Sequence, residues 1–219
     1  MEKEQLEWHW VACIVAQKCE EVYMEDFMTV SDKSYRLEVF RDEYVESPRM
    51  WDNLGTMVCW HRRYSLGDKH NYDDPQVFKG SDAYKNAFVV LPVFLYDHSG
   101  ITISNNDFGD RFDSGQVGYI YVTKERAQRE YNCELNERLA ELIRERLVDE
   151  IKIYDQYLQG DCYAFKIIDE QGEEIDACGG FFGDNLTDVL KEMRESCNDE
   201  FETLFNKIEK HSSAYAAMM

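Results

Sequence analysis

Three regularly spaced aspartates are the first residues in the sequence whose chemistry suggests a site. Asp107, Asp110 and Asp113 form a D-x-x-D-x-x-D pattern within the segment NNDFGDRFDSG. Hard cations such as Mg²⁺ and Ca²⁺ take several oxygen ligands, which makes this loop a candidate cation site. It lacks the D-x-D-x-D-G spacing of an EF-hand, and aspartates in such loops commonly accept hydrogen bonds from their own turns. We therefore predict no metal site and leave open whether the loop holds a cation.

A second group combines an acid, a base and a hydroxyl in the segment Asp97-His98-Ser99. Adjacent residues cannot form a hydrolytic triad, because a triad is assembled in space from separate elements. With a carboxylate such as Asp155 or Asp161 as its partner, His98 would still offer acid/base chemistry. The segments DHSG, DSGQ and YDQY would then line a pocket for a small ligand or a hydrolase substrate. The candidate residues of that pocket are Asp97, His98, Asp113, Gln116 and Asp155.

Motifs of established catalytic or nucleotide-binding sites are missing from the sequence. It contains no G-x-S-x-G nucleophile elbow, no G-x-x-x-x-G-K-[ST] phosphate loop and no G-x-G-x-x-G turn. We therefore predict no catalytic residue and no cofactor, and a binding protein is favoured over an enzyme.

His61, Arg62 and Arg63 form the tightest basic cluster, in the segment CWHRRY. Such a cluster can bind a phosphate or a carboxylate of a ligand. It can equally neutralise acids of the same chain, since charges that leave the solvent are normally paired. The internal role is favoured, because the chain is so rich in acids.

The charge balance is the strongest compositional signal. The 219 residues include 44 Asp and Glu but only 24 Lys and Arg, for a net charge of −20. Residues 1–46 carry a net charge of −7, residues 47–100 are neutral and residues 101–219 carry −13. This charge repels phosphates, so it argues against direct binding to nucleic acid or to anionic membranes. A net charge of roughly 2–8 suffices for solubility, so the excess calls for another explanation.

Two amphipathic helices are expected to display much of this acidic excess. The outer face of the first helix holds Glu137, Glu141, Glu145, Asp149 and Glu150. The last helix supplies the predicted partner-binding surface: Asp188, Glu192, Glu195, Asp199, Glu200 and Glu202.

Seven cysteines and the hydropathy pattern point to the cytoplasm. Seven is an odd number and no CxxC occurs, which fits free thiols in a reducing compartment. No apolar run approaches the roughly 18 residues of a membrane span, and the first residues lack the features of a signal peptide. We expect a cytoplasmic protein with no membrane partner.

Periodicity and turn residues predict the elements that position these groups. They are a short helix within 4–19, a strand over 35–40 paired with 22–30, a loop-rich segment over 61–87, strands over 88–96, 101–104 and 115–122, a helix capped by Thr123, a long helix over 135–158 stopped by Gly160, a hairpin of 162–169 and 173–182, and one last helix over 186–208. Pro92 implies an edge, a bulge or a strand end. The residues expected in the core are Phe88, Val90, Leu95, Val117, Ile120, Leu142, Leu147 and Phe165.

Clustered strands and helices favour an α+β fold over strict β-α-β alternation. We expect a mainly antiparallel sheet, two long amphipathic helices in the C-terminal half and an N-terminal helix. The expected partition is an acidic extension over 1–46, a core over 47–182 and an acidic helix with a frayed tail over 183–219, together forming one compact domain.

Four segments form a distinctive set: SPRMWDNLGTMVCWHRRYSLGD at 47–68, LPVFLYDHSGITIS at 91–104, DSGQVGYIYV at 113–122 and YDQYLQGDCYAF at 154–165. As a set they resemble a family of uncharacterised proteins of bacteriophages and mobile elements of Gram-positive bacteria. The resemblance covers roughly residues 45–182. It implies a phage or mobile-element origin and action in the host cytoplasm, and it brings no catalytic residues.

Charge and resemblance together favour an anti-defence protein. We expect an acidic, non-catalytic inhibitor that mimics DNA and blocks the nucleic-acid site of a basic host defence nuclease, such as a CRISPR effector or a restriction enzyme. Trp51, Trp60 and Tyr64 would add apolar anchors beside the charge. The alternative is a small-ligand-binding protein or hydrolase that uses the pocket described above.

Overall fold

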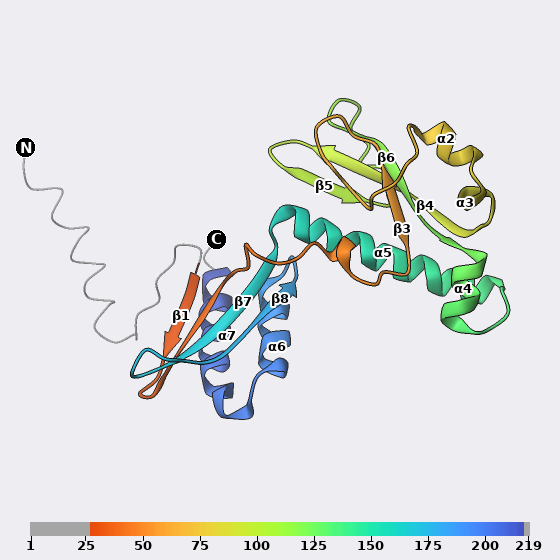
Figure 1. The fold of residues 1–219 in the computed structure, drawn as a ribbon. Coiled ribbons are helices and arrows are strands. Elements are labelled where there is room, and N and C mark those ends of the chain that lie inside the picture. Colours follow the sequence, from red (N-terminus) through yellow and green to blue (C-terminus); the bar gives the residue numbers. More distant parts are fainter. Residues whose placement is uncertain (1–26, 217–219) are drawn as a thin grey trace, which may run out of the picture. The chain divides into compact units, whose positions relative to one another are not determined.

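Two separate four-stranded antiparallel sheets form the framework of the chain (Figure 1). The structure is a computed structural model that describes residues 27–216. The predicted helix within 4–19 and the part of the first strand before Phe27 lie outside these residues. Each sheet belongs to its own unit: unit 1 comprises residues 1–45 and 160–219, and unit 2 comprises residues 46–159.

This division differs from the expected partition into extension, core and terminal helix. The boundary near residue 46 is present, but the hairpin over 162–182 does not belong with the segment that precedes it. The reason is strand pairing: Tyr35–Arg41 lies antiparallel to Cys162–Asp169 over their whole length. Hydrogen bonds between residues far apart in the sequence therefore assign the hairpin to unit 1.

The sheet of unit 1 has the strand order β1-β2-β7-β8. These strands are β1 (Phe27–Ser31), β2 (Tyr35–Arg41), β7 (Cys162–Asp169) and β8 (Glu174–Phe182). Asp32 closes the β1–β2 turn by accepting hydrogen bonds from the backbone N–H groups of Ser34 and Tyr35. Gly172, with φ of 88°, provides the left-handed residue of the β7–β8 turn. Both predicted hairpins are confirmed within the described residues.

The prediction of one continuous last helix over 186–208 is wrong. The structure has α6 (Leu186–Ser196), a 3₁₀ turn η2 (Asp199–Phe201) and α7 (Glu202–Ala216) in place of one long helix. An unbroken helix over 186–208 would be about 34 Å long, beyond the roughly 30 Å that a nine-residue strand spans. Breaking the helix at Cys197 lets two apolar stripes pack on the same sheet. Those stripes are Val189, Leu190 and Met193 on α6, and Leu204, Phe205 and Ile208 on α7.

The sheet of unit 2 has the order β3-β6-β4-β5. These strands are β3 (Thr56–Cys59), β4 (Ala87–Asp97), β5 (Ile101–Ser104) and β6 (Ser114–Thr123). Pro92 pairs with Tyr119 on β6, and β5 joins the other edge of β4 only from Phe94 onward. Proline lacks a backbone N–H, so it fits where one edge of a strand has no partner. A register shift follows between Val93 and Phe94, so of the three alternatives that Pro92 implied, an edge, a bulge or a strand end, the structure has an irregularity of the bulge type one residue later.

Helices α4 (Lys124–Tyr131) and α5 (Glu137–Gln159) agree with the predicted helices. The hydroxyl of Thr123 accepts from the backbone N–H of Arg126 and caps α4 as expected. Gly160, with φ of 75°, follows the end of α5. The loop-rich segment over 61–87 departs from expectation, because it contains two short helices, α2 (Pro75–Gly80) and α3 (Asp82–Lys85). A 3₁₀ turn, η1 (Pro48–Met50), lies before this segment. Asp74 and Ser81 cap α2 and α3.

Burial separates the predicted core residues into three groups. Leu95, Ile120, Leu147 and Phe165 are buried, and Phe88, Val90 and Val117 are partly buried. The prediction that Leu142 lies in the core is wrong, because this side chain is 48% exposed. Its position is out of phase with the buried row on α5, which consists of Leu139, Ala140, Ile143, Leu147, Ile151 and Tyr154. Within residues 27–216 no helix is long and apolar enough to cross a membrane.

Candidate functional site

A buried ion network organises the first loop of unit 2. The guanidinium of Arg49 donates two hydrogen bonds to Asp68, from Nε to Oδ1 and from Nη2 to Oδ2, both at 2.8 Å. Its Nη1 reaches Glu150 Oε2 at 3.2 Å. Glu150 on α5 also accepts from the backbone N–H groups of Leu54 and Gly55. One carboxylate and one guanidinium thus fasten the segment before β3 to α5.

Two of the three charged groups of this network are almost completely buried. The Arg49 and Glu150 side chains are only 4% and 5% exposed. Burial alone would lower the pKa of Arg49, but the hydrogen bonds and negative charges of Asp68 and Glu150 outweigh it and raise that pKa. Asp68 also accepts from the backbone N–H of Met57 at the start of β3. The network is therefore structural, and it fixes the base of the loop that follows β3.

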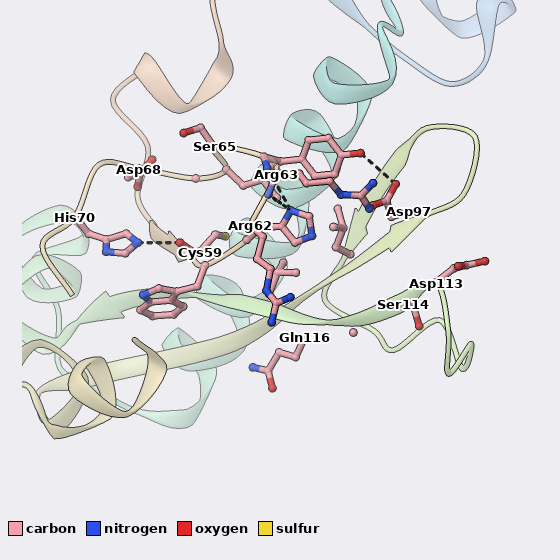
Figure 2. Close-up of a pocket in the computed structure, with 18 of the residues that line it drawn as sticks. Cys59, Arg62, Arg63, Ser65, Asp68, His70, Asp97, Asp113, Ser114 and Gln116 are labelled. Carbon is pink, nitrogen blue, oxygen red and sulfur yellow. Dashed lines mark hydrogen bonds and ion pairs between the residues drawn. The ribbon is translucent and has the colours of Figure 1, made fainter. Parts of the chain in front are cut away.

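That loop forms one wall of a cleft of about 1010 Å³. The cleft is lined by residues 59–70 and 112–117, together with Asp73, Leu95 and Asp97. Figure 2 shows these side chains arranged between the loop after β3 and the strands β4 and β6. Gly67 shapes the loop: its φ is 72°, and its N–H donates to the hydroxyl of Tyr154 on α5.

His61 sets the conformation of the basic cluster in this cleft. Its Nδ1 accepts hydrogen bonds from the backbone N–H groups of Arg63 and Tyr64, at 3.4 and 3.2 Å. The imidazole lies parallel to the Tyr64 ring, with centroids 4.9 Å apart. Because Nδ1 accepts, the ring proton resides on Nε2. His61 is thus a positioned donor at the cleft wall.

The two arginines of the cluster have different roles. Arg63 pairs with Asp97, which also accepts from the Tyr64 hydroxyl at 3.1 Å. This is the internal neutralisation expected for the cluster. Arg62 has no carboxylate partner within residues 27–216, and it is exposed. Figure 2 shows its side chain extending toward the strand that bears Gln116, whereas Arg63 turns toward Asp97.

The residues of the predicted small-ligand pocket are only partly brought together. Asp97, Asp113 and Gln116 line the cleft. His98 does not line it, and its Nδ1 lies 3.1 Å from Asp113 Oδ2, so its partner is neither Asp155 nor Asp161. Asp155 lies outside the cleft and accepts from the backbone N–H of Ile103 at 2.7 Å. The YDQY segment contributes to the cleft through Tyr154, which holds Gly67.

Nucleophilic catalysis finds little support among the described residues. Burial raises the pKa of the Cys59 thiol to about 12, with a further rise from the Asp68 charge, so the thiolate is scarce at neutral pH. The Ser114 hydroxyl donates to the carbonyl of Asp110, not to a base. The His98–Asp113 pair is therefore an acid/base pair without a hydrogen-bonded nucleophile.

The Asp107/Asp110/Asp113 loop uses its carboxylates in turns. Asp107 accepts from the N–H of Gly109, and Asp110 accepts from the N–H groups of Phe112 and Asp113. These backbone hydrogen bonds lower the pKa of Asp110. In the part of the chain that the structure describes, no group of three or more His, Cys, Asp or Glu side chains is arranged to hold a metal ion.

The six predicted partner-binding carboxylates all lie exposed on unit 1. Asp188, Glu192 and Glu195 belong to α6, and the other three follow on η2 and the first turn of α7. Among residues 27–216, Asp188 alone of the six has a basic partner, Lys191 at 3.1 Å. The basic residues nearby turn elsewhere: Arg194 contacts Glu209, and Lys207 donates to the carbonyl of Ser31. Five of the six carboxylates therefore have no basic partner among residues 27–216.

Of the three aromatic residues expected as anchors, two serve the fold of unit 2. The Trp60 indole N–H donates to the carbonyl of Tyr72, and Tyr64 is bonded to Asp97. Trp51 remains 45% exposed.

Sequence reasoning missed Arg49 and misplaced Glu150, which it assigned to a solvated face. The signal was present, because Glu150 is in phase with Ile143 and Leu147, seven and three residues earlier on the same helix. A carboxylate in an apolar stripe indicates a buried partner, here Arg49. Comparison with protein-family models, curated proteins and solved structures finds no match for this chain.

Proposed function

We propose that the protein is a non-catalytic anti-defence inhibitor of phage or mobile-element origin, acting in the host cytoplasm. Its acidic surface would occupy the nucleic-acid channel of a basic host nuclease, such as a CRISPR effector or a restriction enzyme, as a mimic of DNA. The observation that carries this proposal is the set of five exposed carboxylates on α6, η2 and α7 that have no basic partner in the part of the chain that the structure describes.

Spacing and rigidity support this role. Side chains three and four residues apart on a helix lie about 5–6 Å from one another, so Asp188, Glu192 and Glu195 form a row of negative charge. The row stands on helices whose opposite faces are anchored in the apolar core of unit 1. Phosphates in one DNA strand follow one another every ~3.4 Å along the axis, so a fixed row of carboxylates can replace several of them in a basic channel.

The composition of the two units points the same way. The described part of unit 1 holds 18 acidic and 8 basic residues, whereas unit 2 holds 19 and 14. Opposite fields steer association and increase its rate at low salt. The same charge repels nucleic acid, so we expect no complex with duplex DNA or RNA near physiological salt in a gel-shift assay.

Charge reversal on two matched surfaces tests the proposal. One variant changes Asp188, Glu192, Glu195, Asp199 and Glu202 to Lys; the control changes Glu125, Glu130, Glu134, Glu145 and Asp149 of unit 2, all exposed, to Lys. Net charge changes equally in both. Protection of phage or plasmid is then measured in a host with an active restriction or CRISPR system. We expect protection to be lost with the first variant and retained with the control.

Two outcomes would contradict the proposal. Equal loss in both variants would mean that net charge alone matters. The second outcome is that Asp97→Asn or His98→Ala abolishes protection while the unit 1 charge reversal leaves it intact. This result would favour the enzyme or small-ligand alternative. Circular dichroism of each variant confirms that the fold is retained, and increasing salt should weaken binding to the target as the reversal does.

A further inference from the structure

The cleft of unit 2 contains cationic groups that the fold leaves unmatched. Of its four carboxylates, Asp68 is held by Arg49, Asp97 is held by Arg63 and Asp113 faces His98. The fourth, Asp73, is exposed and has no basic partner among residues 27–216. Arg62 and Lys69 also line the cleft, and neither has a carboxylate partner among residues 27–216. Both cations are exposed, so a ligand in the cleft can reach them.

His61 adds a neutral donor to these cations. Its Nδ1 is occupied by the N–H groups of Arg63 and Tyr64, so its Nε2–H is available for a ligand. Arg62 offers a planar fork of N–H donors and Lys69 offers a point charge. Three donors from residues so close in the chain suit a group with several acceptor oxygens. A carboxylate would be satisfied by one arginine, whereas a phosphate has oxygens for all three.

An aromatic side chain stands at the same cleft. Phe112 lines it and is 95% exposed, the highest value for any large apolar residue of the described chain apart from Tyr44. Its backbone is held by the turn that Asp110 makes, so the ring is presented on a fixed loop. An exposed aromatic ring favours stacking with a planar ligand group, which for a nucleobase contributes about 1–3 kcal/mol.

We propose that the cleft binds a mononucleotide, with its phosphate on Arg62, Lys69 and His61 and its base against Phe112. The volume of about 1010 Å³ is at the upper end of the roughly 300–1,000 Å³ usual for small-molecule sites, so a nucleotide fits. The loop that holds these donors is fixed in place by the Arg49 network and by Tyr154, so the cleft is formed before a nucleotide binds. This site is separate in its residues from the acidic surface and does not depend on the inhibitor proposal.

Calorimetric titration of the full chain at low salt tests the site. The probes are AMP, GMP, CMP and UMP. Adenosine and inorganic phosphate, the two parts of AMP, are titrated separately for comparison. We expect at least one mononucleotide to bind with Kd below about 1 mM and more tightly than either part. Arg62→Ala should weaken binding at least tenfold, while Arg129→Ala, an exposed arginine of α4 outside the cleft, should change it less than twofold.

Further outcomes decide between this site and its alternatives. Phe112→Ala should weaken nucleotide binding several-fold and leave the affinity for inorganic phosphate unchanged. Absence of binding for all four nucleotides, or equal affinity in Arg62→Ala and Arg129→Ala, would overturn the proposal. Inorganic phosphate binding as tightly as every nucleotide would also overturn it, since the base would then make no contact. The unit 1 charge reversal should leave nucleotide affinity intact, so failure of either proposal is distinguishable from failure of the other.

Discussion

The two units of this chain treat charge in opposite ways. Unit 2 buries charges and matches them: Arg49 lies between Asp68 and Glu150 inside the fold, and hydrogen bonds satisfy each group. In unit 1 the described core is built from apolar side chains, and the acids stand on the outer faces of α6 and α7. Glu150 and Gln156 are the buried polar residues of the described chain, and both belong to unit 2.

This difference separates stability from recognition. A buried ion pair is costly to break, because removal of one partner leaves an uncompensated charge in a medium of low dielectric constant. Exposed carboxylates contribute little to stability individually, so a fold can change them freely. We infer that the Arg49–Asp68–Glu150 network maintains the structure of unit 2, whereas the exposed carboxylates of α6, η2 and α7 contribute little to the stability of unit 1.

The largest effect should follow from breaking the network of unit 2. Glu150→Ala leaves Arg49 buried without one partner and leaves the N–H groups of Leu54 and Gly55 unsatisfied. We expect a loss of about 3–5 kcal/mol in the free energy of unfolding, measured with urea. Glu145→Ala, exposed on the same helix, is the control and should cost less than about 0.5 kcal/mol. Equal losses would show that the network is not structural.

A pair of leucines on α5 provides the next contrast. Leu147 is fully buried, while Leu142 is 48% exposed. Leu147→Ala should lower the free energy of unfolding by about 2–5 kcal/mol, because it leaves a cavity in the core of unit 2. Leu142→Ala should cost less than about 1 kcal/mol. A similar cost for both, by thermal or chemical denaturation, would mean that the buried face of α5 is misassigned.

Alkaline pH should weaken unit 2 through a buried thiol. The pKa of Cys59 is about 12 in the folded chain against an ordinary value near 9. A raised folded pKa stabilises the fold fully below pH 9, and this contribution is lost as the pH rises from 9 to 12. We expect about 1 kcal/mol to be lost by pH 10. Cys59→Ala should flatten the slope of stability against pH, whereas Cys133→Ala, an exposed thiol, should not; the same slope in both variants would refute the assignment.

The smallest effect is expected for a single carboxylate of unit 1. Glu192→Gln removes one exposed charge that has no basic partner in the described chain. The free energy of unfolding should change by less than about 0.5 kcal/mol, and binding to a target by about 0.2–1 kcal/mol. A loss of stability above about 2 kcal/mol would show that Glu192 has a structural role and would erase the contrast between the units.

Local signals predicted the elements of both units well. The hydroxyl of Thr123 caps α4, Gly172 makes the β7–β8 turn, and Pro92 lies beside a register shift in β4. These features depend on neighbours within a few residues, so sequence patterns contain them. The break at Cys197 depends instead on the length of the sheet that the helix must cover.

Features that depend on contacts between residues far apart in the sequence could not be predicted from local patterns. The pairing of β2 with β7 decides the membership of the units, and no local pattern marks it. The candidate cleft shows the same limit: His61, Arg62 and Arg63 were recognised as a cluster, but only the geometry separates the paired Arg63 from the unpaired Arg62. Periodicity alone could have placed Glu150 in the buried row of α5.

The pairing of β2 with β7 has a consequence for synthesis of the protein. Roughly 120 residues separate the two strands, and the whole of unit 2 lies between them. At ribosomal rates of about 5–20 residues per second, β1 and β2 leave the ribosome about 6–24 s before β7 does. During that interval the nascent hairpin has no neighbour along one edge, while unit 2 can already fold. Chaperones that shield exposed strand edges would therefore act on this chain early, at its first hairpin.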